Sequence, residues 1–151
     1  MEIERKFLIH SLPNSLEQYE HTEIEQAYIS VDPSIRLRKR NNDYYLTVKQ
    51  SGFMVREEME IAITKEQYER LWSKIETGII RKTRFLIPIQ DGLTAELDVF
   101  HGVLQGLMIV EVEFNSIEQA NSFEPPTWFG TDVTNNPKYS NNNLATSKFS
   151  D

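Results

Sequence analysis

Apolar and polar residues alternate through most of the first 114 residues of the chain. Successive side chains of a β-strand point to opposite faces, so this period of two predicts strands rather than helices. The pattern places eight strands at residues 2–9, 23–31, 34–40, 44–50, 54–63, 81–88, 94–100 and 108–114. Asn41-Asn42-Asp43 and Gln90-Asp91-Gly92 have the residue types of hairpin turns. Eight strands with mostly short connections indicate a closed or nearly closed antiparallel β-barrel.

Two capping boxes predict helices that interrupt the series of strands. Thr64 and Gln67 form the first box, and an apolar stripe follows it at helical spacing on Tyr68, Leu71, Trp72 and Ile75. Ser116 and Gln119 form the second box, before a helix that buries Ile117, Ala120 and Phe123. Weaker patterns predict a short helix within residues 12–19 and a turn or helix from Ser140. The expected fold is α+β, an eight-stranded antiparallel β-barrel (tunnel) with helices packed on its outside, in a single domain over residues 1–151.

One face of nearly every predicted strand is ionised and the other is apolar. The ionised positions are Glu2, Glu4, Lys6, Arg36, Arg38, Arg40, Lys49, Arg56, Glu58, Glu60, Lys82, Arg84, Glu96, Asp98, Glu111 and Glu113. For a single strand, a sheet with one face in water explains this alternation. The strand centres, however, hold Arg, Lys, Glu and Asp in place of the uncharged polar residues that are usual in a solvated sheet. The two helices also need an apolar sheet face to cover, so we expect the charged faces to line the inside of the barrel.

Charges enclosed in a barrel need partners, because an unpaired buried charge is costly. Guanidinium groups match phosphate oxygens, and the carboxylate oxygens of Glu and Asp suit hard cations such as Mg²⁺ and Mn²⁺. Side chains on one face of a strand are about 6.6 Å apart, so a row such as Arg36 and Arg38 can follow neighbouring phosphates. The pattern therefore predicts a site for a polyanion together with a divalent metal.

Composition narrows the classes of protein to which the chain can belong. The formal net charge is −7, which argues against a nucleic-acid binder. The absence of cysteine excludes disulfides, thiolate zinc sites and cysteine nucleophiles. No apolar run reaches the roughly 18 residues of a membrane span, and the first residues lack the apolar core of a signal peptide, so we expect a cytoplasmic location. The histidines, at positions 10, 21 and 101, share no ligand spacing.

The charged residues form a series of short motifs along the chain. In order they are Glu2-x-Glu4-x-Lys6, Gln26-x-Tyr28, Arg36-Leu37-Arg38, Thr47-Val48-Lys49, Arg56-x-Glu58-x-Glu60, Lys82-Thr83-Arg84, Glu96-Leu97-Asp98 and Glu111-Val112-Glu113. A single motif of this kind arises by chance, but an ordered series over residues 1–114 is specific. It resembles the CYTH superfamily of triphosphate tunnel metalloenzymes, and in particular its short bacterial tripolyphosphatase-like members.

The resemblance implies an eight-stranded tunnel, a requirement for Mg²⁺ or Mn²⁺ and a substrate with a triphosphate group. Metal ligands and their supporting acids would be Glu2, Glu4, Glu58, Glu60, Asp98, Glu111 and Glu113. Phosphate-binding residues would be Arg36, Arg38, Lys49, Arg56, Lys82, Arg84 and Lys138. The catalytic residues would be Glu4, Lys6 at the scissile phosphoryl group, and Tyr28 as a proton acceptor. Arg40 is either an exposed strand end or an additional phosphate contact.

The expected activity is metal-dependent hydrolysis of inorganic tripolyphosphate to pyrophosphate and phosphate. A class IV adenylyl cyclase and a thiamine triphosphatase are alternatives within the same family. Outside it, the alternatives are a non-catalytic polyphosphate-binding module and an interaction domain with a solvated sheet. We expect the partner to be a small molecule with a triphosphate group, and neither nucleic acid nor a membrane. The resemblance also makes a homodimer plausible.

Overall fold

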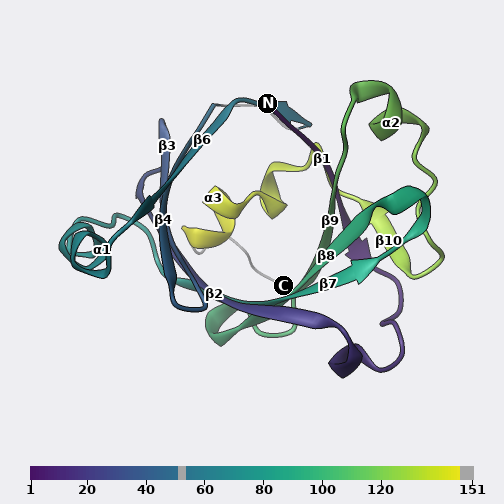
Figure 1. Cartoon of the computed structure of the whole chain (residues 1–151), viewed down its shortest axis with the longest axis horizontal. Coiled ribbons are helices and arrows are strands. Elements are labelled where there is room, and N and C mark those ends of the chain that lie inside the picture. Colours follow the sequence, from purple (N-terminus) through teal and green to yellow (C-terminus); the bar gives the residue numbers. More distant parts are fainter. Residues whose placement is uncertain (51–53, 147–151) are drawn as a thin grey trace.

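The computed structural model describes residues 1–50 and 54–146. Ten strands in these ranges form one antiparallel sheet that curls into a barrel (Figure 1). They are β1 (Glu2–Ile9), β2 (Glu20–Ser30), β3 (Ser34–Arg40), β4 (Asp43–Lys49), β5 (Val55–Arg56), β6 (Glu58–Ile63), β7 (Ile80–Pro88), β8 (Thr94–His101), β9 (Met108–Glu113) and β10 (Phe129–Asp132). All eight predicted strands are confirmed. The strand predicted at 54–63 is divided into β5 and β6, and β10 was not predicted.

β1 closes the barrel because it pairs with three other strands. Its first residues pair with β5, where Glu2 lies opposite Arg56, and its middle pairs with β9, where Glu4 lies opposite Glu113. From β9 the pairing continues through β8, β7, β2, β3 and β4 to β6, which follows β5 in the chain. Since β5 and β6 share the place of one strand, the ring has the eight positions that the sequence predicts. β10 pairs with the last residues of β1 and adds to this ring.

Both predicted hairpin turns are confirmed, and each uses a residue with left-handed backbone. Asn41 has φ 54°, and its side-chain oxygen accepts a hydrogen bond from the Glu23 amide at 3.0 Å. Asp91 and Gly92 have φ 60° and 72°. Asn, Asp and Gly adopt this conformation at low cost, which is why these residue types allow the chain to reverse here.

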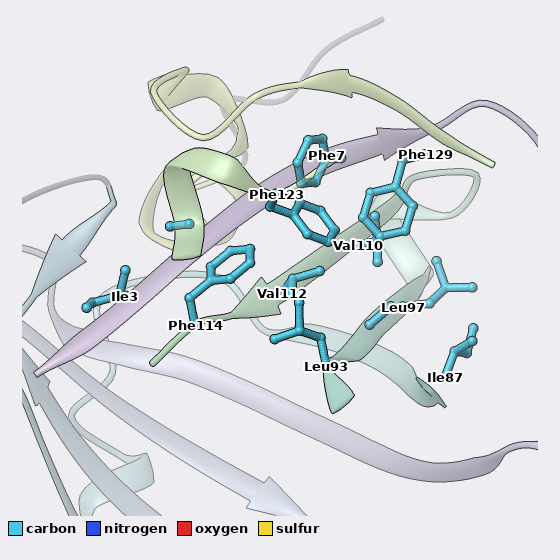
Figure 2. Close-up of a cluster of buried hydrophobic side chains, with 12 residues drawn as sticks. Ile3, Phe7, Ile87, Leu93, Leu97, Val110, Val112, Phe114, Phe123 and Phe129 are labelled. Carbon is cyan, nitrogen blue, oxygen red and sulfur yellow. The ribbon is translucent and has the colours of Figure 1, made fainter. Parts of the chain in front are cut away.

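The apolar outer face of β1, β7, β8 and β9 packs against α2 (Ile117–Ser122) and β10, as Figure 2 shows. The buried cluster comprises Ile3, Phe7, Ile87, Leu93, Ala95, Leu97, Val110, Val112, Phe114, Ala120, Phe123 and Phe129. Arg5 lies on this outward side of β1. Its guanidinium donates to the Ala120 carbonyl at 2.9 Å and to Asp132 at 2.9 Å, so it ties the end of α2 and β10 to the barrel.

The two predicted capping boxes differ in completeness. Thr64 and Gln67 form both hydrogen bonds of the box at the start of α1 (Lys65–Trp72), which covers β3 and β4 from outside. At α2 the Ser116 hydroxyl accepts from the Gln119 amide, as predicted, but the Gln119 side chain accepts from Asn115 instead of Ser116. The helix predicted within residues 12–19 is only a 3₁₀ turn, η1 (Leu16–Gln18). No helix in the described part of the chain is long and apolar enough to span a membrane.

A third helix, α3 (Asn141–Ala145), lies within the ring of strands (Figure 1). It begins after the Ser140 N-cap, as the sequence indicates. Leu144 and Ala145 pack against a buried apolar cluster that comprises Tyr28, Ile80, Phe100, Leu104, Leu107 and Ile109. Asn142 donates to the Val31 carbonyl at 3.1 Å, and Ala145 accepts from the Gly78 amide at 2.9 Å. α1 and α2 thus cover the outside of the barrel, whereas α3 and this cluster fill one part of its inside.

Candidate active site

The remaining inward-facing side chains enclose a cavity of about 170 Å³. Its carboxylates are Glu2, Glu4, Glu58, Glu60, Glu96, Glu111 and Glu113, its cations are Arg36, Arg38, Arg40, Lys49 and Arg84, and Asn141 is its one uncharged residue among those described. The charged faces therefore line the inside, as the sequence predicts. A larger hollow of about 660 Å³ shares only Lys49 and Glu58 with this cavity among the described residues and carries no comparable set of charges.

Acids and cations occupy opposite halves of the barrel wall. The carboxylates come from β6, β1, β9 and β8, which follow one another around the ring. The cations come from β7, β3 and β4, with only β2 between the first two. Lys6 and Arg56 lie on the acidic side and line a smaller space of about 50 Å³, into which Glu4 also faces. A ligand in the cavity therefore meets a cationic wall on one side and an acidic wall on the other.

Arg36 and Arg38 are buried cations with neutral partners. They are 4% and 5% exposed, and neither forms an ion pair with any described acid. Arg38 Nε donates to Gln26 Oε1 at 2.8 Å, and Arg36 donates to the Thr47 hydroxyl at 3.4 Å. Burial, with Arg36 and Arg84 nearby, lowers the pKa of Arg38 to about 9. Two adjacent buried charges without a counter-ion favour binding of an anion.

Unpaired buried donors point to the same kind of ligand. In the described ranges, the buried side-chain atoms without a hydrogen-bond partner are Gln26 Nε2, Arg36 Nε, Arg56 Nε and Lys82 Nζ. Lys82 Nζ does lie 2.7 Å from Asp98 Oδ2, but this ion pair is not aligned as a hydrogen bond. All four atoms are donors, and an ionised phosphate chain offers many acceptors and no donors.

Glu4 lies in the acidic half and is only 7% exposed. One of its oxygens accepts a hydrogen bond from Arg56 at 2.6 Å. Burial, followed by the neighbouring Glu111 and Glu2, nevertheless raises the pKa of Glu4 to about 8, and the cations Lys49 and Arg56 do not outweigh these effects. Near neutral pH this carboxyl group therefore retains a proton unless a further cation takes the proton's place.

Glu111 also lines the acidic half, but its pKa is lowered, whereas that of Glu4 is raised. Its carboxylate lies 3.7 Å from Lys6 Nζ, which donates to the Tyr139 carbonyl at 3.0 Å. Although burial opposes ionisation, Lys6, Arg84 and Lys82 hold the pKa of Glu111 well below its usual range. Glu111 is thus ionised beside a carboxyl group, Glu4, whose pKa is raised.

A second pair of acids shares one lysine. Lys49 Nζ lies 3.1 Å from Glu2 and 3.8 Å from Glu58. Burial opposes ionisation of Glu2, but Lys49, the hydrogen bond with Glu58 and Arg56 together outweigh it and lower the pKa of Glu2. Burial and the hydrogen bond to Glu2 raise the pKa of Glu58. Lys49 therefore does not neutralise both Glu2 and Glu58. A further cation could bind at this part of the wall.

Asp98 lies on the inner face of β8 without lining the cavity, and it holds two cations. It is 1% exposed, accepts from Arg84 at 2.8 Å and 2.9 Å, and lies 2.7 Å from Lys82 Nζ. Arg84 and Lys82 outweigh the effect of burial and lower the pKa of Asp98. Asp98 and Lys82 do not line the cavity. The structure therefore places Asp98, predicted among the metal ligands and their supporting acids, where it orients Arg84.

The acidic half fits a divalent cation by charge and by donor type. When every group is ionised, the seven carboxylates and five cations give the cavity lining an excess of two negative charges, and Lys6 and Arg56 from the adjoining space bring the sum to zero. No described group of three His, Asp or Glu side chains is close enough to hold a metal ion. The acids instead pair with cations, as Glu4 does with Arg56. The carboxylates that could reorient to bind a divalent cation are those of Glu2, Glu4, Glu111 and Glu113.

Tyr28 and Lys138, like Asp98 and Lys82, do not line the charged cavity. Tyr28 is 2% exposed within the apolar cluster against α3. Burial raises its pKa, although Arg36 and Arg38 act in the opposite direction, so its hydroxyl stays protonated near neutral pH. This environment argues against a role as proton acceptor. Lys138 is an exposed residue of the turn η4 (Pro137–Tyr139) and does not line the cavity.

Four residues of the site were not among the predicted site residues. Arg40 and Glu96 line the cavity, and both follow the same strand period as their predicted neighbours, which was the signal available for them. Gln26 supports Arg38 and belonged to a recognised motif. Asn141 lines the cavity from α3. No sequence signal identified Asn141, because its place depends on how the C-terminal segment folds back into the barrel.

Comparison with known proteins agrees with this geometry. The model of the CYTH domain matches residues 1–124. The chain is 41% identical over 149 residues to a Nitrosomonas europaea protein named inorganic triphosphatase, covering 97% of each chain. It is 35% identical over 151 residues to a protein of the same name from Acetivibrio thermocellus, covering 95% of this chain and 92% of that protein.

Solved structures share the fold. The crystal structure of the inorganic triphosphatase NE1496 superposes with a TM-score of 0.72 at 40% identity, covering 97% of this chain and 95% of that one. A putative adenylyl cyclase from Hippeastrum superposes with a TM-score of 0.60 at 17% identity, covering 80% and 83% of the two chains, and supports the fold alone. The charged barrel, the ordered motifs and these matches lead to one assignment: the chain belongs to the CYTH domain family.

Proposed function

We propose that this protein hydrolyses inorganic triphosphate to pyrophosphate and phosphate with the help of a divalent metal, Mg²⁺ or Mn²⁺. The observation that carries the proposal is the pair Arg36 and Arg38, buried in the basic wall with only neutral partners. A plain interaction domain gains nothing from such a pair, because two unpaired buried charges destabilise the folded state. Relatives named inorganic triphosphatase, at 41% and 35% identity, support the same substrate.

The acidic wall favours an enzyme over a simple anion binder. A phosphate chain alone would bring negative charge to a lining that already has seven carboxylates. A hard divalent cation between the two would relieve this repulsion, and oxygen donors are the ligands that Mg²⁺ and Mn²⁺ prefer. We assign the metal to Glu2, Glu4, Glu111 and Glu113, with Glu58 and Glu60 in support. When bound, the cation supplies positive charge against the leaving pyrophosphate.

The form of the cavity favours an inorganic substrate. Its volume of about 170 Å³ is well below the roughly 300–1,000 Å³ of sites for organic ligands. No apolar or aromatic residue is among the described residues that line it, so a purine or thiazolium ring has no surface on which to stack. The lining therefore favours hydrolysis of inorganic triphosphate over the cyclase and thiamine triphosphatase activities.

Hydrolysis asks the chain for positioning and electrostatic stabilisation more than for covalent chemistry. Water forms a new bond to the terminal phosphorus, the bridging P–O bond breaks, pyrophosphate leaves with the electron pair, and the proton that the water loses passes to the phosphate products or to solvent. Arg36, Arg38 and Arg84 would hold the phosphate oxygens from the basic wall. Lys6, whose Nζ is fixed by the Tyr139 carbonyl, would lie beside the phosphoryl group that is transferred.

The proposal is tested by release of phosphate and pyrophosphate from tripolyphosphate, ATP and thiamine triphosphate, each with Mg²⁺, Mn²⁺ or EDTA. We expect metal-dependent conversion of tripolyphosphate far faster than that of the others. Glu4→Gln is expected to be inactive, with Glu66→Gln, at an exposed position of α1, as the matched control. Cyclic AMP from ATP would replace the proposal by a cyclase. No turnover, with clear thermal stabilisation by tripolyphosphate, would leave a binding module.

A further inference from the structure

The chain fixes its inward-facing arginines in two different ways. Arg84 is held by Asp98 and Arg56 by Glu4, so each of these guanidinium groups has a carboxylate as its partner. Arg38 is held instead by the amide oxygen of Gln26, at 2.8 Å from Arg38 Nε. A carboxylate at this position would orient the guanidinium equally well, but it would also neutralise its charge.

Gln26 is well placed for a fixed role. It lies on β2 directly opposite Arg38 on β3, and it is 0% exposed. Its Oε1 accepts from Arg38, whereas its Nε2 has no acceptor among the described residues. A buried amide donor without an acceptor costs free energy. The Nε2 of Gln26 is therefore available to a ligand that offers an acceptor.

We infer that Gln26 is a positioning residue for substrate binding: it orients the Arg38 guanidinium toward the phosphate chain and leaves its positive charge uncompensated. The inference rests on the proposed function, because it assumes that the anion in the cavity is a phosphate chain. Gln26 accepts its hydrogen bond from Arg38 Nε. The two terminal nitrogens of the guanidinium can therefore make a bidentate contact with phosphate. The unused Nε2 donor of Gln26 strengthens the positive character of this wall.

The experiment compares Gln26→Glu with the wild-type protein, because the two side chains have nearly the same shape. The new carboxylate pairs with Arg38, so we expect KM for tripolyphosphate to rise roughly tenfold or more. Thermal stabilisation by tripolyphosphate should fall in parallel, with Mg²⁺ and with EDTA. The ligand-free protein should unfold at the same temperature or higher, since a buried cation has gained a partner. Gln105→Glu is the control, with the same charge change at an exposed position.

Gln26→Leu separates positioning from a structural role. It removes the acceptor and adds no charge, so KM should rise less than in Gln26→Glu while the unfolding temperature of the ligand-free protein falls. A structural role alone predicts lower unfolding temperatures in both variants and an unchanged KM, and that result would overturn the inference. An inactive wild-type protein that tripolyphosphate still stabilises would contradict the proposed function, but the binding comparison would still test the role of Gln26.

Discussion

Asp98 holds the Arg84 guanidinium by two hydrogen bonds, 2.8 Å from Nε and 2.9 Å from a terminal nitrogen. This bidentate pair is fully inside the protein, since Asp98 is 1% and Arg84 9% exposed. Burial alone would lower the pKa of Arg84, but Asp98 raises it well above its ordinary value. Arg84 therefore faces the cavity as a fixed cation whose orientation is set by Asp98 on the neighbouring strand.

The first prediction concerns this pair. Asp98→Asn leaves the buried Lys82 without an ion-pair partner among the described residues and leaves Arg84 with Glu96 alone, at 3.5 Å; breaking a buried pair in this way costs about 3–5 kcal/mol. We expect the free energy of unfolding, measured with urea, to fall by that amount. Asp43→Asn is the control, because Asp43 is exposed. If Asp98 were instead only a metal ligand, metal-free Asp98→Asn would be as stable as the wild type.

The second prediction concerns the paired arginines of the basic wall. Arg38→Gln removes a guanidinium that has no carboxylate partner among the described residues, so its main loss is in binding of the anion. We expect KM for tripolyphosphate to rise at least about tenfold, the equivalent of one charge-assisted hydrogen bond. Arg70→Gln, an exposed position of α1, should leave KM unchanged. Equal values of KM for the two variants would contradict the assignment of Arg36 and Arg38 as the anion site.

The third prediction follows from the pKa of Glu4, about 8 in the folded protein against an ordinary value of 4.5. Between these values the unfolded chain has lost its proton while the folded protein retains it, so stability falls as pH rises from about 4.5 to 8. We expect the metal-free protein to show this loss in thermal melts relative to Glu4→Gln. Saturating Mg²⁺ should reduce the loss, because the cation replaces the proton. A wild-type protein that follows Glu4→Gln at every pH would refute the prediction.

The fourth prediction concerns α3 and the inner end of the cavity. Leu144 is 1% exposed among Tyr28, Ile80 and Phe100. Leu144→Ala leaves a space in this cluster and should lower the free energy of unfolding by about 2–5 kcal/mol. Leu12→Ala, where the side chain is 46% exposed, is the control and should cost far less. Equal effects of the two substitutions would show that α3 does not pack in the barrel as described.

Much of the site could be predicted because a strand fixes the face of each side chain locally. Glu2, Glu4 and Lys6 point inward and Ile3 and Phe7 outward for no reason other than the period of two. The same period places Arg36 and Arg38 on the inner face of β3. Thr64 caps the helix that begins at the next residue, and Asn41 reverses the chain through its own backbone conformation, so both roles could also be predicted.

The pairing of charges could not be predicted, since it depends on which strands become neighbours. Glu4 and Arg56 are 52 residues apart along the chain. They meet only because β1, which pairs with β9, also pairs with β5 at its first residues. Asp98 has the residue type of a metal ligand, yet the register of β7 and β8 places it opposite Arg84, with which it pairs, and it does not line the cavity. Tyr28 shares the inner face with the charges, but the apolar cluster around α3 covers it.

The sequence by itself determined the strands, their turns, the inward face of the charges and the membership of a family of phosphate-binding barrels. Only the tertiary structure decided where the barrel closes, that β10 extends it, and that α3 lies inside it and brings Asn141 to the cavity. The physical reason is the range of the interactions. Side-chain direction and capping depend on residues a few positions apart, whereas closure, burial and pKa depend on segments that meet only in the folded protein.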